Sequence, residues 1–166
     1  MRIDRIVAMP VQWAPDDAPA QYSAYVRVWS DDGRYGIGEA SPMQGGLASL
    51  GIVVHDLAPR LIGRDVLEHA VLQDRLLHSL AKLGPEGALS GALAAIDIAL
   101  WDLKGKLFGE PVYKLLGGAW RTELPFYASI GGNGAERPLD EVLRIVERRL
   151  EDKPAAIKIR FDNDRV

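Results

Sequence analysis

The longest apolar stretch of the chain runs from Ala94 to Gly118 and reads AAIDIALWDLKGKLFGEPVYKLLGG. Leucine and isoleucine recur at helical spacing up to Gly109, and Pro111 then opens a second, shorter apolar segment. A helix with so wide an apolar face has to be covered by other elements. The residues before it should therefore pack onto it, and we expect one domain to end with this stretch, at about residue 118.

The N-terminal residues predict a three-stranded antiparallel meander. Apolar and polar side chains alternate in three segments, residues 2–10, 22–30 and 35–40. Asp32-Gly33 lies between the last two, and an Asp-Gly pair in that place is typical of a hairpin turn. Residues 12–21, with two prolines, and residues 41–46 are expected to form loops.

After residue 46, the spacing of apolar residues changes from every second residue to a period of about 3.6, which predicts helices. They are expected at residues 47–61, 65–82 and 86–108. The apolar stripe predicted for the second consists of Val66, Leu67, Ala70, Val71, Leu77, Leu80 and Ala81. In the third, alanines at 92, 95 and 99 should allow close approach to a neighbouring element. Strands followed by helices, without alternation, indicate an α+β domain over residues 1–118.

After this domain, strand and helix patterns alternate. Residues 124–130 and 155–161 are apolar strand-like runs, and residues 138–152 between them have helical spacing. A strand, helix and strand of this size form a βαβ unit, whose strands are parallel and buried on both faces. Such a unit does not stand alone, so we expect residues 119–166 to begin a (β/α) barrel, which takes about 250 residues when complete.

Charge and composition exclude several function classes. The net charge of −3 leaves no basic field for nucleic acid or anionic lipid, so neither is an expected partner. The absence of cysteine excludes disulfides, thiolate zinc sites and cysteine nucleophiles. The sequence has neither a signal-peptide pattern nor an apolar run long enough for a membrane span. We expect a cytoplasmic protein.

Two cations lie two residues apart in the last strand, so their side chains project from the same face. They are Lys158 and Arg160. One interpretation is that they are solvated or paired with a neighbouring acid. The other is an anion or oxyanion site where the C-terminal ends of barrel strands meet, with the lysine able to act as a base. The residues alone leave both open.

Other polar residues favour structural roles. The glycines at 131, 132 and 134 have no phosphate-loop or dinucleotide spacing and are interpreted as a turn. The three histidines share no ligand spacing and are expected at the surface or partly buried: His55, His69 and His78. Asp97 is expected to anchor its helix by accepting a hydrogen bond from a neighbouring backbone. Trp13 and Met43 are apolar side chains on expected loops, where exposure is less usual.

The Ala94–Gly118 run resembles the signature of the mandelate racemase/muconate lactonizing enzyme branch of the enolase superfamily. The matching residues are Asp97, Ala99, Asp102, Gly105, Lys106 and the PVYKLLGG continuation. The resemblance implies that residues 1–118 form that family's capping domain and that residues 119–166 start its barrel. It also implies abstraction of a proton α to a carboxylate, with the enediolate stabilised by Mg²⁺.

The second barrel strand of the family usually ends in Lys-x-Lys, one lysine facing the substrate carboxylate and the other acting as base. Lys158 matches the first position, whereas Arg160 departs from the second. Arginine stays charged and is a better carboxylate clamp than a base. This disfavours two-base racemisation and favours one-base chemistry such as sugar-acid dehydration. By the same resemblance the two loops close over the barrel, with Trp13, Met43 and Gln44 contacting the substrate.

The resemblance places the carboxylate ligands of Mg²⁺ beyond residue 166, so none is expected in this chain. We therefore expect the N-terminal part of a longer homo-oligomeric dehydratase, racemase or cycloisomerase that acts on a small carboxylate substrate, the chain alone being inactive. The alternative is a non-catalytic, cap-like binding module.

Overall fold

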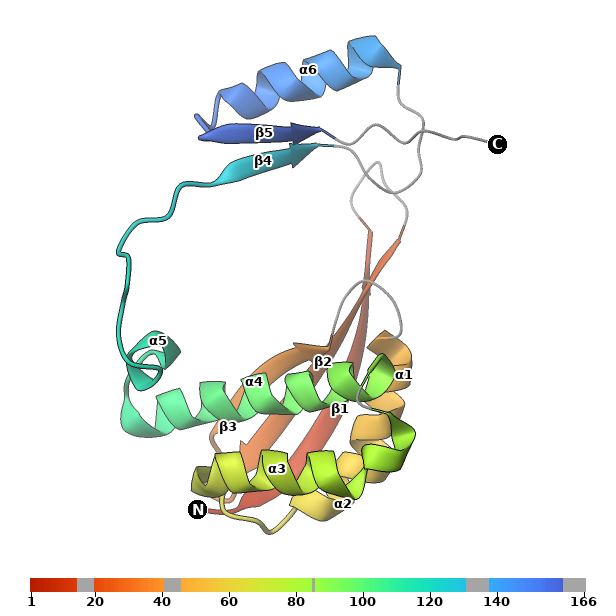
Figure 1. Cartoon of the computed structure of the whole chain (residues 1–166), viewed down its shortest axis with the longest axis vertical. Coiled ribbons are helices and arrows are strands. Elements are labelled where there is room, and N and C mark those ends of the chain that lie inside the picture. The colour runs from red at the N-terminus through yellow and green to blue at the C-terminus, as the bar shows by residue number, and fades with distance from the viewer. Residues whose placement is uncertain (15–19, 41–45, 85, 131–137, 160–166) are drawn as a thin grey trace. The chain divides into compact units, whose positions relative to one another are not determined.

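The computed structural model describes the whole chain except residues 15–19, 41–45, 85, 131–137 and 160–166. The chain forms two compact units, Met1–Gly118 and Ala119–Val166. Figure 1 shows the elements of both. Each unit is described by itself.

The first unit contains an antiparallel sheet in the order β1-β2-β3. The strands are β1 (Ile3–Trp13), β2 (Gln21–Ser30) and β3 (Tyr35–Ala40). This confirms the predicted meander, but β1 is longer than expected. Pro10 does not end it, because β1 is an edge strand, where a sheet accommodates proline. Gln12 and Trp13 pair with Tyr22 and Gln21, so their prediction as loop residues was wrong.

The turn between β2 and β3 is built around the Asp32 carboxylate. It accepts hydrogen bonds from Ser30 Oγ at 2.5 Å, from the Arg34 backbone N–H at 3.2 Å and from Arg34 Nε at 2.8 Å. These partners, the Arg34 guanidinium foremost, hold the pKa of Asp32 well below its ordinary value. Gly33 has a φ of 87°, the left-handed region that glycine adopts without strain. The Asp-Gly pair therefore forms the turn that the sequence predicts.

The helices follow the sheet in the expected order, with shorter regular segments than predicted. The first consists of α1 (Gly46–Ile52), a π-helical turn (Val53–Leu57) and α2 (Ala58–Leu61). The second consists of a 3₁₀ turn (Val66–Glu68), α3 (His69–Ser79) and another 3₁₀ turn (Ala81–Leu83). The third is α4 (Ala88–Phe108), which α5 (Val112–Leu115) follows after Pro111.

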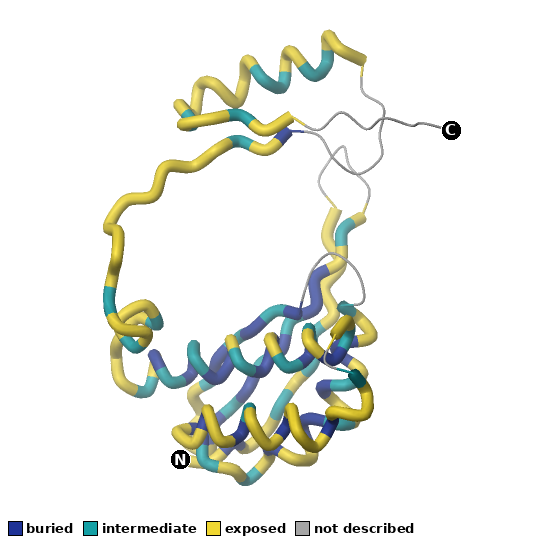
Figure 2. Tube along the Cα trace, in the orientation of Figure 1, coloured by how far each residue is buried: buried dark blue, intermediate teal, exposed yellow. Residues whose placement is uncertain are grey.

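Helix α4 packs on β2 and β3 and carries the centre of the core. Its leucines and isoleucines at helical spacing confirm the predicted apolar face: four are buried and two are partly buried against the core, namely Leu89, Ile96, Leu100 and Leu103, and Leu93 and Leu107. The predicted close approach at the alanines is also found. On the strand side it depends on two glycines of β3: a Cβ at Gly36 would lie 2.0 Å from the Ala99 carbonyl oxygen. Figure 2 shows the buried side of α4 against the sheet and its exposed side outside.

The stripe predicted for α3 was wrong in part. Leu67, Val71 and Leu77 are each about half exposed, and Ala70 is exposed as well. The buried positions are Val66, His69, Leu72, Leu76 and Leu80. Helix α3 packs against α4 along one narrow side, so it buries fewer apolar residues than its sequence offers.

The second unit pairs two parallel strands, β4 (Tyr127–Ile130) and β5 (Ala156–Ile159), joined through helix α6 (Leu139–Leu150). This confirms the predicted order of strand, helix and strand, but β4 begins at Tyr127, not at residue 124, and within this unit most strand residues are exposed instead of buried on both faces. Within the described part of the chain, no helix is both long and apolar enough to cross a membrane.

Candidate functional site

Lys158 occupies the second-to-last position of β5 as the structure describes it, directly beside Ser129 of β4. The register continues with Ile130 beside Ile159. Because the strands are parallel, their C-terminal ends lie at the same edge of the pair. An ammonium group and a hydroxyl therefore share one strand face near that edge.

The other face of the pair is the one that α6 covers. Ile130 is 4% exposed, and Ala128 and Ile157 are half-buried, whereas Ser129 and Lys158 are exposed. Helix α6 packs against β4 within this unit, with Val142, Ile145 and Val146 as its half-buried apolar residues. Lys158 thus extends from the face opposite the helix. In a (β/α) barrel, helices cover the outside, so the opposite face is the interior.

The remaining predicted site residues belong to the other unit or lie outside the described residues. Trp13 lies at the end of β1 in the first unit, opposite Gln21, with 51% of its surface exposed. Met43, Gln44 and Arg160 lie outside the described residues, as do the glycines at 131, 132 and 134. The structure therefore describes Lys158 and Trp13, each within its own unit.

Sequence reasoning missed a contact between α3 and α4, in which a buried histidine meets an aspartate whose side chain is 41% exposed. His69 is 5% exposed, so its expected surface or partly buried position was wrong. Its Nε2 lies 2.6 Å from Asp97 Oδ1, and its ring meets that of Trp101 edge-on, with the centroids 4.9 Å apart. The expected backbone partner of Asp97 was also wrong, because its partner is this imidazole. The sequence did contain a sign that His69 is buried: it has helical spacing with the apolar residues Val66, Leu72 and Leu76.

The backbone anchor of α4 is Asp102. Its Oδ2 accepts a hydrogen bond from the Ile37 N–H of β3 at 2.8 Å and one from Lys106 Nζ at 2.7 Å. Lys106 Nζ also donates to the Tyr35 carbonyl oxygen at 2.9 Å. This acid and this lysine thus fasten the helix to the edge of the sheet. These contacts are the structural reason for an acid and a lysine at these two positions of the Ala94–Gly118 run.

Gly105 of the same run closes the end of α4. Its carbonyl oxygen accepts the N–H groups of Gly109, which has a φ of 67°, and of Glu110. A Cβ at Gly105 would lie 2.8 Å from the Glu110 carbonyl oxygen, so a larger residue does not fit. In the structure, the contacts of Asp102, Gly105 and Lys106 pack this run against the sheet and end the helix.

No three histidine or acidic side chains among the described residues come together as a possible metal-binding group. The candidate site in the second unit is therefore a single cation, Lys158, near the C-terminal edge of the parallel strands β4 and β5.

Known proteins resemble most of this chain. The sequence profile of the mandelate racemase/muconate lactonizing enzyme N-terminal domain matches residues 2–117. A D-galactonate dehydratase family member from Paenibacillus sp. is 40% identical over 124 residues, which cover 74% of this chain and 30% of the relative. A D-mannonate dehydratase from Caulobacter vibrioides is 33% identical over 126 residues, which cover 76% and 31%.

Two solved structures share the fold over nearly the whole chain. A mandelate racemase/muconate lactonizing protein from Paracoccus denitrificans, complexed with magnesium, is 61% identical with a TM-score of 0.85 over 98% of this chain and 43% of its own. The 3,6-anhydro-D-galactonate cycloisomerase from Zobellia galactanivorans is 28% identical with a TM-score of 0.81 over 96% and 42%. The chain spans about a third of the length of the two curated relatives.

Proposed function

The chain belongs to the mandelate racemase/muconate lactonizing enzyme family, and from this premise we propose that it forms the capping domain and first barrel strands of a sugar-acid dehydratase. In that reaction the C–H bond α to the carboxylate breaks and the β-hydroxyl leaves as water. The resulting enol then tautomerises to a 2-keto-3-deoxy acid. The names of the dehydratase relatives support this reaction class.

The position of Lys158 carries the proposal. It lies at the C-terminal edge of a parallel strand pair, on the face without a helix, and that edge of a barrel is where active sites form. We assign its ammonium group to the substrate carboxylate. As the α-proton leaves, negative charge grows on the carboxylate oxygens, and a fixed cation stabilises the transition state more than the ground state.

Arg160 is assigned to the same carboxylate as a second clamp. A guanidinium remains charged at all ordinary pH values and does not accept the α-proton. The base that takes the α-proton then belongs to another part of the longer protein. A single base favours dehydration over racemisation, because racemisation needs a second base on the other face of the substrate. Cycloisomerisation is the second candidate, since the Zobellia relative is named for that reaction and it also needs only one α-proton transfer.

Trp13, Met43 and Gln44 are assigned to the substrate-facing rim of the cap. The support comes from Trp13, a large aromatic side chain that is half exposed at the end of a long hairpin. An aromatic group in that place excludes water when it closes on a ligand. We also propose that the longer protein is a homo-oligomer, and the reaction itself assigns no surface of this chain to the subunit interface.

Magnesium enters the proposal as a requirement of the longer protein. Among the described residues no three histidine or acidic side chains come together as a metal-binding group, and no step above passes through the ion. The Paracoccus relative was solved with magnesium, which supports the requirement.

The test is a screen of the natural protein that contains this chain against a panel of sugar acids, with and without Mg²⁺, for the appearance of an α-keto acid. We expect turnover of at least one acid, abolished by a chelator. The competing function is a non-catalytic, cap-like binding module. A natural protein with an intact mass near 18.2 kDa that is folded, monodisperse and without turnover would support the module instead.

A further inference from the structure

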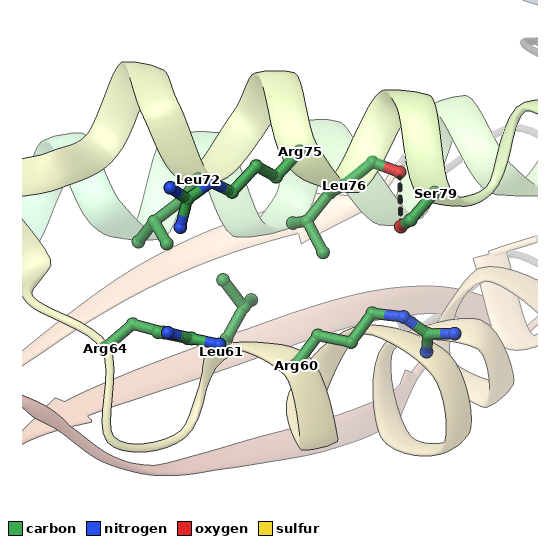
Figure 3. A pocket seen from close by; sticks show the side chains of 7 residues that line it. All are labelled: Arg60, Leu61, Arg64, Leu72, Arg75, Leu76 and Ser79. Atoms are coloured by element: carbon green, nitrogen blue, oxygen red, sulfur yellow. Dashed lines mark hydrogen bonds between the residues drawn. The ribbon is translucent and has the colours of Figure 1, made fainter.

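Helices cover one side of the sheet in the first unit. Val26 and Val28 of β2 are fully buried on that side, next to the two glycines of β3 against which α4 packs. The helices also close on one another there. Figure 3 shows Leu61 directed toward α3 from the α2 segment, where Leu72 and Leu76 face it, and all three leucines are buried. This side of the sheet is therefore core and leaves no surface for a partner.

The opposite side of the sheet is open to solvent. Successive side chains of a strand point to opposite sides, so the neighbours of the buried residues lie on this second side. They are half-buried in the central strand β2, and in β1 Val7 and Val11 are 38% and 39% exposed. We call this side the open face. Pairing across the strands arranges its side chains in three rows: Arg5, Trp29 and Tyr35; Val7, Arg27 and Ile37; and Met9, Tyr25 and Glu39.

Two arginines of the open face stack on aromatic rings. Arg5 Cζ lies 4.3 Å from the centroid of the Trp29 ring, and Arg27 Cζ lies 4.4 Å from the centroid of the Tyr35 ring. The centroids of the two rings are 4.6 Å apart. An aromatic ring attracts a cation without neutralising its charge. The rings therefore hold two positive charges on the open face.

The charges of the open face have no partners within the described part of the chain. Arg5, Arg27 and Glu39 form no ion pair there, in contrast to Lys106, which pairs with Asp102. Arg27 Nε is buried without a hydrogen-bond partner, whereas the two Nη atoms of the same guanidinium are not buried and have no acceptor. The open face thus presents unpaired charges of both signs.

Charge complementarity favours a second copy of this chain as the partner. An interface between identical copies related by a two-fold axis needs a surface that complements itself. An axis that crosses the strands between the Arg27 row and the Tyr25 row sets each of these rows over the other. Glu39 of each copy then lies next to Arg27 of the other, and Met9 lies over Val7. Packed sheets are about 10 Å apart, a distance that an arginine and a glutamate side chain span together.

We propose that the open face of β1, β2 and β3 is an interface between two copies of this chain, held by two reciprocal ion pairs between Arg27 and Glu39. Apolar side chains of the same rows surround these pairs and exclude water from them. The proposal goes beyond the proposed reaction, because Arg27 and Glu39 are not assigned to the substrate.

The test reverses the charges in the 166-residue chain and follows association by sedimentation velocity. The unaltered chain should dimerise with a dissociation constant of roughly 100 µM, since a face of three strands is smaller than a standard interface. R27E and E39R each bring like charges together and should weaken dimerisation at least tenfold. R148E, at an exposed position of α6, makes the same change of net charge as R27E and should leave the dissociation constant unchanged.

Restoration of the pairs separates this interface from general charge repulsion. An equimolar mixture of R27E and E39R should dimerise again, because each pair then joins an acid of one copy to an arginine of the other. The double variant R27E/E39R should dimerise by itself for the same reason. Circular dichroism checks that each variant is folded, and E39R carries the comparison if R27E is not. An unaltered chain that stays monomeric at 1 mM, a single variant that dimerises as tightly as the unaltered chain, or a mixture that stays monomeric would each overturn the proposal.

The natural protein that contains this chain tests another occupant of the open face, a different part of the same subunit. E39R should lower the mass of its oligomer, measured by sedimentation, and the double variant R27E/E39R should restore that mass. An oligomer of unchanged mass with a lower unfolding temperature in E39R would assign the open face to contacts within one subunit and overturn the proposal. These measurements do not depend on turnover, so their outcome is separate from that of the proposed reaction.

Discussion

A Cβ atom on Gly38 would lie 1.9 Å from the carbonyl oxygen of Ala95. The backbone of β3 and the backbone of α4 therefore meet at van der Waals distance with no side chain between them. Gly36 repeats this contact two residues earlier, against Ala99. The sheet and the longest helix of the first unit owe their close packing to these two glycines and the alanines opposite.

Replacing Gly38 by alanine should destabilise the chain by about 3 kcal/mol or more, because the helix has to move away from the strand. Urea unfolding followed by circular dichroism measures this. G51A is the matched control: Gly51 lies in α1 with nothing within 4 Å of its Cβ position. It should stabilise by up to about 1 kcal/mol, since alanine favours helix. Similar effects of the two changes would contradict the account.

H69A should cost about 2–3 kcal/mol, because it leaves a cavity and removes the hydrogen bond to Asp97. D97N should cost less, since the amide oxygen still accepts from the imidazole. H78A is the control: His78 is 76% exposed in its side chain, so the free energy of unfolding should change by less than about 0.5 kcal/mol. If H69A changed the free energy of unfolding as little as H78A does, the pair of His69 and Asp97 would not stabilise the packing of α3 on α4.

D102A should destabilise by about 1–2 kcal/mol, because the Ile37 N–H loses its acceptor at the edge of β3. The specific sign is faster amide hydrogen exchange at Ile37. D102N keeps a carbonyl oxygen in that place and should preserve most of the protection. Unchanged exchange in D102A would show that Asp102 does not anchor the strand.

The Asp32 turn predicts a pH dependence. Its folded pKa lies below the unfolded value, near 3.8, so its contribution is present above that value and lost as the pH falls through the folded pKa. The stability difference between the wild-type chain and D32N should be constant between pH 5 and pH 7, both about one unit or more above that unfolded value, and should shrink below about pH 4. Urea titrations across this range measure it. A difference that grows in acid would have the wrong sign.

Periodicity predicted the elements of the fold well, because alternation and the 3.6-residue repeat follow from which side of an element is buried. It failed where tertiary context decides. Pro10 looked like the end of a strand, yet an edge strand tolerates it. Helix α3 offers apolar residues on more than one side, and only packing against α4 selects the side with Leu72 and Leu76.

The candidate site was less predictable than the fold. Lys158 was singled out from its position near the end of a strand, but its place beside Ser129 depends on strand register. His69 was missed, since a lone histidine within an apolar stripe has no ligand spacing. Gly36 and Gly38 were missed because alternating glycines in a strand acquire meaning only when the alanines of α4 lie against them. The roles of Lys158, Arg160, Trp13, Met43 and Gln44 remain predictions.

The most direct test of the central claim is exchange of the substrate α-proton with deuterium, measured by NMR in D₂O on the natural protein that contains this chain. K158A should lower the exchange rate by about a thousandfold, since a fixed cation at the developing charge is lost. K82A, at an exposed lysine of the first unit, should leave the rate unchanged. Exchange in K158A within tenfold of the wild-type rate would contradict the assignment of Lys158 to the substrate carboxylate.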